Sequence, residues 1–292
     1  MNSEKIYIQK LTQLIKNAFE EDIGVGDHTT LASIGKQERG KAILKIKDHG
    51  ILAGMDVAEF IFSYAEPTSI VKKMKKDGDE MHPGEIAFEV EASIYTLLTC
   101  ERLVLNCMQR MSGIATLTKK YTDKLKGYHS KILDTRKTTP NFRLLEKEAV
   151  RIGGGENHRF GLYDMIMLKD NHIDYCGGIE NAINRANAYI SKNNLDIRIE
   201  VETRDIEDVK KVIETGKIHR IMLDNFTPEK IKEALKIIDG KYETEASGGI
   251  SLENIVSYAK TGVDYISSGA IIHQATSLDL SLKAVIENKN EQ

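Results

Sequence analysis

The chain has 292 residues, of which 41% are hydrophobic and 29% charged, so it is long enough for one large domain or two moderate ones with buried cores. Its formal net charge of -3 excludes the global positive field that drives non-specific nucleic-acid binding, and any anion recognition must be local. No stretch approaches the roughly 20 apolar residues of a membrane span, and the N-terminal stretch has no signal-peptide core. Three scattered cysteines without zinc spacing indicate a reducing compartment, so we expect a cytoplasmic protein.

The first third of the chain predicts a mixed unit of helices and strands. Apolar residues at helical spacing predict helices over 4–20, 56–65 and 94–112. Runs with partial alternation, separated by turn residues, predict strands over 41–47, 50–55, 68–74 and 85–93. The pattern changes near Gly113, so we expect one domain over 1–113 and a second over 114–292.

The second region alternates short apolar runs with longer amphipathic segments. The predicted strands are 131–134, 165–170, 197–202, 220–224, 242–247 and 263–269. The predicted helices are roughly 141–152, 178–192, 205–215, 227–238 and 251–260, several of them with Asp, Ser or Thr-Pro caps. About six such units predict a parallel sheet with right-handed crossovers, as a barrel or a doubly wound sheet.

The polar residues favour the barrel, because they fall at the C-terminal ends of nearly all of these strands. They lie at 134–137, 169–172, 200–202, 224–225, 247–249 and 268–269. In a parallel barrel those ends converge on one face, where the loops build the active site. A doubly wound sheet would concentrate them at one switch point instead.

Cations gather at the strand and loop ends of the first two units. They are Arg136, Lys137, His158, Arg159 and Lys169, with His172 nearby. A guanidinium matches a carboxylate or phosphate, and several together indicate a multiply charged anion. The alternative is that they are ordinary solvated loop charges. The acids Glu146 and Glu148 lie on a predicted helix, where Lys147 and Arg151 can offset them.

Two acids are the last residues of neighbouring predicted strands: Glu202 ends EVE and Asp224 ends RIMLD. Such a pair can hold Mg²⁺, which prefers oxygen ligands, or can stabilise positive charge that develops in a substrate. The alternative is that the two acids are ion-pair partners of the nearby Arg and Lys residues.

Two glycine-containing loops, in EASGGI (245–250) and ISSGAI (266–271), each stand between a strand and a helix start, where backbone N–H groups can bind phosphate. The glycines of GGGENHR (153–159) instead make room for His158 and Arg159, because the GK[ST] ending of a P-loop is absent. No catalytic-triad order, HExxH or GxSxG motif is present. These features together predict a site for a phosphorylated substrate with a pyrophosphate leaving group beside a small di-acid.

Several motifs resemble one family along nearly the full chain. They are EEDIGVGDHTT, ERLVLNCMQRMSGIAT, DTRKTTPNFRLLEKEAV, GGGENHRFGLYDMIMLKDNHI, EVE, LDNF and EASGGI. In order and spacing they are similar to the quinolinate phosphoribosyltransferases, also called carboxylating nicotinate-nucleotide pyrophosphorylases. The resemblance implies an enzyme of NAD biosynthesis that joins quinolinate to 5-phosphoribosyl-1-pyrophosphate. Its products would be nicotinate mononucleotide, pyrophosphate and CO₂, with Mg²⁺ as cofactor.

The resemblance also implies an α/β architecture: an N-terminal α/β sandwich, an incomplete parallel α/β barrel of about six strands, and a C-terminal helix that packs back on the sandwich. It implies a homodimer, or a higher oligomer, in which one subunit's sandwich caps the partner's barrel. No nucleic acid or membrane is expected as a partner.

The site residues implied by the resemblance form three groups. The quinolinate group comprises Arg136, Thr138, His158 and Arg159, with Arg102 supplied across the dimer interface. The catalytic group comprises Lys137, Lys169, Glu202 and Asp224, and its two acids are also the implied metal ligands. The group for the 5-phosphate comprises Ser247, Gly248, Gly249, Ser268, Gly269 and Ala270.

The sequence departs from the family pattern at two places. Asn141 stands where glycine follows TTP, and Asn tolerates the left-handed backbone better than most residues. One extra residue lies in the region 217–219, which leaves open whether Glu200 or Glu202 is the functional acid. In DTRKTTP (134–140) we expect Asp134 and the hydroxyls of Thr135, Thr138 and Thr139 to order the loop, and Pro140 to take the first position of the next helix.

Other functions stay open from the sequence. One is a phosphoribosyltransferase of the same architecture that uses nicotinate or nicotinamide, or a homologue from molybdenum-transport operons. A non-catalytic barrel that binds a phosphorylated ligand is another. A mono-acid would not need so many cations, which favours quinolinate, and a sensor would not need the acid pair.

Overall fold

The structure is a computed structural model that describes residues 3–35 and 38–286. The chain forms two compact units. The N-terminal unit comprises Met1–Leu117, Thr139–Gly154 and Gln274–Gln292, and the barrel unit comprises Thr118–Thr138 and Gly155–His273.

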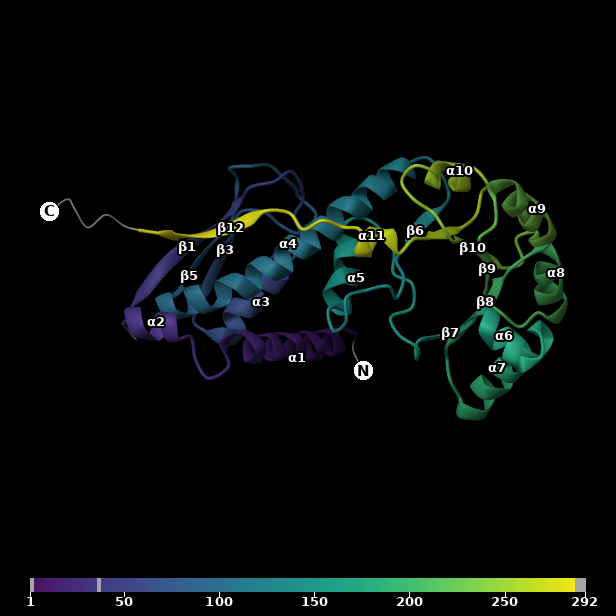
Figure 1. Ribbon diagram of the computed structural model, residues 1–292, viewed down its shortest axis with the longest axis horizontal. Coiled ribbons are helices and arrows are strands. Elements are labelled where there is room, and N and C mark those ends of the chain that lie inside the picture. The colour runs from purple at the N-terminus through teal and green to yellow at the C-terminus, as the bar shows by residue number, and fades with distance from the viewer. Residues whose placement is uncertain (1–2, 36–37, 287–292) are drawn as a thin grey trace. The chain divides into compact units, whose positions relative to one another are not determined.

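The N-terminal unit is built on a four-stranded antiparallel sheet of order β12-β1-β5-β3 (Figure 1). Its strands are β1 (Arg39–Ile46), β3 (Ile70–Lys73), β5 (Ile86–Ser93) and β12 (Leu280–Val285). A two-stranded ladder joins β2 (Gly50–Ile51) to β4 (Glu80–Met81). The helices are α1 (Ser3–Ile23), α2 (His28–Ser33), α3 (Met55–Ala65), α5 (Arg143–Ile152) and the part of α4 (Ile94–Lys124) up to Leu117.

The core of this unit follows from alternation in the strands. In β1, Ala42, Leu44 and Ile46 are buried while the residues between them are half-buried, so one face of the strand lines the core. On this core Phe62 of α3 meets Phe88 of β5 edge to face, with ring centroids 6.2 Å apart.

The expected C-terminal helix is instead the strand β12. Its sequence LSLKAV alternates, with Leu280 and Leu282 buried, and it pairs antiparallel with β1 along the edge of the sheet. Because β12 and α5 both belong to the N-terminal unit, the compact units do not follow a single boundary at residue 113.

Helix α4 is longer than its predicted range and runs through Gly113. A side chain at Gly113 would collide with the backbone of Thr276. The glycine thus marks a close approach of two backbone segments, and no helix end occurs there.

The barrel unit contains a six-stranded sheet in which every pairing is parallel, as predicted. Its strands are β6 (Lys131–Leu133), β7 (Met165–Leu168), β8 (Arg198–Thr203), β9 (Arg220–Asp224), β10 (Glu243–Ser247) and β11 (Tyr265–Ser267). The order is β6-β11-β10-β9-β8-β7, so the first strand in the chain pairs with the last. This is the order of a barrel that is open between β6 and β7, which confirms the incomplete parallel barrel.

Helices follow the strands of this sheet. They are α6 (Asp170–Cys176), α7 (Ile179–Asn193), α8 (Ile206–Thr215), α9 (Pro228–Ile238), α10 (Ile255–Ala259) and α11 (Ala270–His273). Figure 1 shows α8 and α9 on the outer side of β8 and β9. Capping side chains begin two of them, because Asp205 accepts from the Asp208 N–H and Thr227 from the Lys230 N–H.

The two departures from the family pattern adopt left-handed backbone. Asn141 has φ 63°, as expected for a residue in place of glycine. In the region with the extra residue, Gly216 has φ 66° and Lys217 φ 58°, so the chain turns tightly between α8 and β9. The prediction for Pro140 was wrong, because α5 begins at Arg143.

Candidate active site

The end of β6 is ordered by a buried carboxylate. Asp134 is fully buried and accepts hydrogen bonds from Asn157 Nδ2 at 2.6 Å and the His158 N–H at 2.9 Å. After it the chain turns, with the Lys137 N–H donating to Thr135 Oγ1 at 3.0 Å and the Thr138 N–H to the Arg136 carbonyl at 2.9 Å. These bonds confirm that Asp134 and the hydroxyl residues order this loop.

Two of the predicted cations, Arg136 and Arg159, act on each other electrostatically. Arg136 is exposed and Arg159 is half-buried, with Nη1 of Arg159 3.4 Å from the Met165 carbonyl oxygen. Burial, and next the positive charge of Arg136, lower the pKa of Arg159. Two guanidiniums that repel each other in this way form a place where an anion would be stabilised by both.

Lys169, Glu202 and Asp224 also lie together. Lys169 Nζ is 2.9 Å from Oε2 of Glu202, whose side chain is buried. Burial raises the pKa of Asp224, the nearby charge of Glu202 raises it further, and Lys169 opposes this effect. Asn225 Nδ2 donates to Asp224 Oδ2 at 2.7 Å. The ends of β7, β8 and β9 therefore bring one ammonium and two carboxylates within electrostatic reach.

The glycine loops after β10 and β11 adjoin each other. Ser268 Oγ donates to the Ile250 carbonyl at 2.9 Å, which ties the second loop to the first. Gly248 has φ 95°, and a side chain there would meet the backbone nitrogen of Asn225 at 2.9 Å, so glycine is required. A side chain at Gly269 would meet Lys137 Cδ at 2.8 Å, which places the Lys137 stem against this loop.

Other members of the phosphate group lie in the same two loops. Ser247 ends β10, and its carbonyl accepts from the Asn225 N–H at 2.8 Å. Gly249 follows with φ 62°, and Ala270, the first residue of α11, is nearly buried.

His158 faces the barrel interior. Its Nε2 is 2.8 Å from Oε2 of Glu200 and 3.3 Å from Oε2 of Glu245, and both acids are fully buried. Arg220 Nη1 donates to Glu245 at 2.9 Å, and its guanidinium stacks on the Tyr265 ring with the central carbon 4.1 Å from the ring centroid. Potential ligand atoms of the histidine and the two acids all lie within 4.8 Å of one another. We call His158, Glu200, Arg220 and Glu245 the interior cluster.

Glu200 and Glu202, the two candidates for the functional acid, have different partners, and only Glu200 belongs to the interior cluster. Glu200 and Glu202 point to the same side of β8 because side chains two residues apart share a face. Glu202 contacts Lys169 near the strand end, whereas Glu200 contacts His158 deeper in the barrel. Burial and then repulsion from Glu245 raise the pKa of Glu200 to about 7.

Sequence reasoning did not single out Arg220 or Glu245. The sequence ETEAS could have indicated Glu245, because its alternation places Glu243 and Glu245 on one face of a strand. EVE places Glu200 and Glu202 on one face in the same way. Arg220 reaches both acids, because Nε donates to Glu243 at 3.1 Å while Nη1 donates to Glu245.

The prediction for Glu146 was wrong. Its carboxylate is fully buried in the N-terminal unit and accepts from Nε of Arg110 at 3.0 Å, a residue outside the helix that the prediction did not name. Glu148 is paired with Arg151 at 3.0 Å, as predicted. Arg102 is an exposed residue of α4 in the N-terminal unit.

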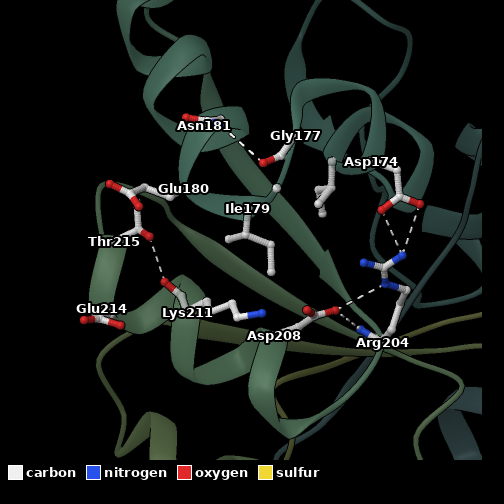
Figure 2. A pocket seen from close by; sticks show the side chains of 12 residues that line it. Asp174, Gly177, Ile179, Glu180, Asn181, Arg204, Asp208, Lys211, Glu214 and Thr215 are labelled. Carbon is white, nitrogen blue, oxygen red and sulfur yellow. Dashed lines mark hydrogen bonds and ion pairs between the residues drawn. The ribbon is translucent and has the colours of Figure 1, made fainter.

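A cavity of about 500 Å³ lies elsewhere in the barrel unit (Figure 2). It is lined by residues of α6, α7 and α8 and the adjoining loops, among them Ile179 and Lys211. Arg204 crosses one side of it, 3.1 Å from Asp174 and 3.3 Å from Asp208. No predicted site residue lines this cavity, so the candidate site is the set of strand ends.

Among residues 3–35 and 38–286, we find no helix that is both long and apolar enough to cross a bilayer. The three cysteines are free thiols. Burial raises the pKa of Cys100 and of Cys107 to about 12, so both thiols stay protonated at neutral pH.

Fold and site together define a class of protein. An open parallel α/β barrel that carries cations, paired acids and two glycine loops at the C-terminal ends of its strands is an enzyme-type barrel built to bind anions and phosphate. Comparison with protein families identifies the particular family within this class. Residues 27–112 match the N-terminal domain and residues 114–283 the C-terminal domain of quinolinate phosphoribosyl transferase, and the chain belongs to this family.

Relatives support the assignment over nearly the whole chain. The chain is 44% identical over 288 residues to the chloroplastic nicotinate-nucleotide pyrophosphorylase [carboxylating] of Arabidopsis thaliana, covering 94% of this chain and 82% of that protein. It is 42% identical over 281 residues to the probable nicotinate-nucleotide pyrophosphorylase [carboxylating] of Bacillus subtilis, covering 96% of both chains.

Solved structures agree. NadC from Streptococcus pyogenes superposes with a TM-score of 0.87 at 39% identity, over 94% of this chain and 97% of the other. Human nicotinic acid phosphoribosyltransferase superposes with a TM-score of 0.59 at 12% identity, over 88% of this chain and 72% of the other, which is a likeness of fold alone.

Proposed function

We propose that this protein is a quinolinate phosphoribosyltransferase, which converts quinolinate and 5-phosphoribosyl-1-pyrophosphate into nicotinate mononucleotide, pyrophosphate and CO₂ in NAD biosynthesis. The observation that carries the proposal is the pair of arginines Arg136, which is exposed, and Arg159, which is half-buried with Nη1 3.4 Å from the Met165 carbonyl oxygen and whose pKa is lowered by burial and then by the charge of Arg136. A substrate with two adjacent carboxylates would occupy both guanidiniums, whereas a mono-acid would leave one charge uncompensated. Thr138, in the same loop as Arg136, would add a hydroxyl donor.

The acid pair fits a magnesium ion by its chemistry. Glu202 and Asp224 supply oxygen ligands, and their mutual repulsion, which raises the pKa of Asp224, would be relieved by a divalent cation. In the proposed enzyme these two carboxylates would hold Mg²⁺ together with pyrophosphate oxygens of the substrate. When bound, the ion would neutralise charge on the leaving group.

The residues of the chain would then act on the charges that develop in the reaction. Loss of pyrophosphate makes the ribose ring oxocarbenium-like, and the carboxylates of Glu202 and Asp224 would stabilise that positive charge. Lys137 and Lys169 would balance the negative oxygens of the leaving group. The loops at 247–249 and 268–270 would fix the 5-phosphate through backbone N–H groups, so that the sugar is aligned with the pyridine nitrogen.

Decarboxylation needs no further cofactor in this scheme. After the pyridine nitrogen attacks the sugar, the ring nitrogen carries a positive charge. Departure of the neighbouring 2-carboxylate as CO₂ leaves an electron pair on that ring carbon, where the adjacent positive nitrogen stabilises it, and a proton from solvent then bonds to the carbon. The chain has to hold the ring by the carboxylate that is retained while this occurs.

The test is turnover of labelled quinolinate. Purified protein with phosphoribosyl pyrophosphate and Mg²⁺ should release labelled CO₂, with nicotinate as the control acid. Arg136→Ala and Arg159→Ala should raise the KM for quinolinate by at least about tenfold, since each removes a charged hydrogen-bond donor. Turnover of nicotinate in place of quinolinate would overturn the proposal.

The proposed enzyme acts as a homodimer in the cytoplasm, where Arg102 of one subunit completes the quinolinate site of the other. The family resemblance supports the dimer, and the three free thiols are consistent with a reducing compartment. Sedimentation of the purified protein tests the dimer.

A further inference from the structure

Asn225 lies between the acid pair and the first of the two glycine loops. It follows Asp224, the last residue of β9, and is exposed. Asp224 is the register partner of Ser247 on β10, and the Asn225 N–H donates to the Ser247 carbonyl at 2.8 Å. The pairing of the two strands therefore continues one residue beyond β9, and Asn225 is attached to the residue that begins the loop at 247–249.

The side chain of Asn225 contacts both Asp224 and this loop. Its Nδ2 donates to Asp224 Oδ2 at 2.7 Å, which restricts rotation of that carboxylate and sets the direction of Oδ1. The Ser247 side chain is a second hydrogen-bond partner of Asp224. On its other side, Asn225 packs against Gly248 so closely that a side chain on Gly248 would overlap Oδ1 and Cγ of Asn225. One amide group thus has a carboxylate of the acid pair on one side and the loop at 247–249 on the other.

The backbone of Asn225 makes these contacts possible. Consecutive side chains of an extended strand point to opposite faces, so an extended residue 225 would direct its side chain away from Asp224. Asn225 instead has φ 57°, in the left-handed region, which glycine and asparagine tolerate better than most residues. The same conformation occurs at Asn194, the C-cap of α7 with φ 50°, which lies between α7 and the start of β8. Asn194 is therefore a matched control for substitutions at Asn225.

We propose that Asn225 is a positioning residue: it holds the Asp224 carboxylate at a set distance from the loop at 247–249, so that both can bind one molecule of phosphoribosyl pyrophosphate. In the proposed reaction the loop binds the 5-phosphate, while Asp224 acts at the other end of the sugar, where pyrophosphate leaves. The ribose fixes the spacing of those two ends, so the protein has to hold its own two groups at a matching spacing. The proposal deepens the function proposed above and rests on it, although it concerns only the sugar phosphate and not the acid that accepts the sugar.

Binding of phosphoribosyl pyrophosphate, measured by calorimetry, tests the proposal without turnover. Phthalate takes the place of quinolinate in the presence of Mg²⁺, because it has two adjacent carboxylates but no ring nitrogen that could attack the sugar. Asn225→Gly keeps the left-handed backbone and removes the amide, so it should weaken binding about tenfold, the effect of one hydrogen bond to a charged group. Asn225→Asp keeps the shape but has no donor for Asp224, and it should bind at least as weakly. Asn194→Gly, the matched control, should bind as the unsubstituted protein does.

The kinetic constants distinguish positioning from a merely structural role. In turnover with quinolinate, Asn225→Gly should raise the KM for phosphoribosyl pyrophosphate about tenfold and leave the KM for quinolinate within about twofold. Its unfolding temperature should stay within about 2 °C of that of the unsubstituted protein. A merely structural role would move both KM values and the unfolding temperature together. That result would overturn the proposal, as would unchanged binding of phosphoribosyl pyrophosphate by Asn225→Gly or by Asn225→Asp.

A double variant distinguishes positioning from direct contact with the substrate. In an Asp224→Ala background, Asn225→Gly should cause little further loss of phosphoribosyl pyrophosphate binding, because the carboxylate that the amide holds is gone. Losses that add in full would show that Asn225 binds the substrate itself, and the proposal would then be wrong. If the unsubstituted protein bound phosphoribosyl pyrophosphate but released no CO₂ from quinolinate, only the proposed function would fail, whereas absence of that binding would overturn both.

Discussion

Replacing Glu146 by leucine should destabilise the protein strongly. The carboxylate is 0% exposed and receives four hydrogen bonds: two from Arg110 at 2.9 and 3.0 Å, and two from the N–H and hydroxyl of Thr139 at 2.8 and 2.9 Å. Leucine fills a similar volume but removes the acceptor of Arg110 Nε and Nη2 and of the Thr139 amide, while Arg110 Nη1 keeps its bond to the Ala275 carbonyl. Breaking a buried pair in this way costs about 4 kcal/mol, and for a unit of this size that is a fall of roughly 10 °C in the unfolding temperature.

The assay is thermal unfolding followed by circular dichroism, with two comparisons. Glu148→Leu on the same helix removes only the ion pair with Arg151 near the surface, so its unfolding temperature should change by about 1 °C or less. The double variant Arg110→Met/Glu146→Leu removes both charges and should recover much of the loss, leaving about 1–2 kcal/mol for the unpaired Thr139 amide. An unfolding temperature for Glu146→Leu close to that of the unsubstituted protein would refute this reasoning.

Three further predictions concern other parts of the chain. Glu66 has its pKa lowered to about 2; burial alone would raise it, but the bonds from the Ser93 N–H and from Arg39 outweigh this. The stabilisation that the Glu66 carboxylate gives the folded protein should therefore be complete above about pH 4.5, the ordinary pKa of this group, and be lost as the pH falls toward 2. In urea unfolding, Glu66→Gln should lower the free energy of unfolding by about 1–2 kcal/mol at pH 7 and not lower it at pH 2. Gly248→Ala should raise the KM for phosphoribosyl pyrophosphate more than Gly249→Ala, because both have positive φ but only the first would push a side chain into neighbouring backbone; equal effects would contradict the close-packed loop. Mixing inactive Arg102→Ala and Lys169→Ala subunits should restore about one quarter of the activity if Arg102 acts in the partner's site, and should restore none if it acts within its own subunit.

Regular structure was predictable where the hydrophobic period was clear. The six barrel strands occur within about two residues of their predicted ranges, because each is a short apolar run bounded by polar turn residues. The C-terminal strand was missed, since the position that a strand takes at the edge of β1 depends on a partner more than two hundred residues earlier in the chain. Helix α4 exceeded its range because Gly113 is used for a backbone contact that the local sequence does not encode.

The candidate site was predictable in its composition but only partly in its layout. The topology of a parallel barrel was enough to place Lys169, Glu202 and Asp224 together, because strand ends converge whatever the side chains are. The direction of each charged side chain depends on its partner. The segment that leads to Arg159 is attached to Asp134, two residues before Arg136, through Asn157 Nδ2 and the His158 N–H, and this attachment could not be deduced from the residues alone.

The interior cluster shows why such partners matter for function. A histidine beside an arginine in the motif ENHR is equally compatible with two residues that bind one anion and with one residue that supports the other. The local sequence also does not show Glu200 and Glu245, which come from strands far along the chain and lie 2.8 and 3.3 Å from Nε2 of the ring. Burying two carboxylates inside a barrel is costly unless they are paired, so His158 and Arg220 are needed there before any substrate binds. The positions of His158 and Arg220 are therefore set by the buried acids of β8 and β10.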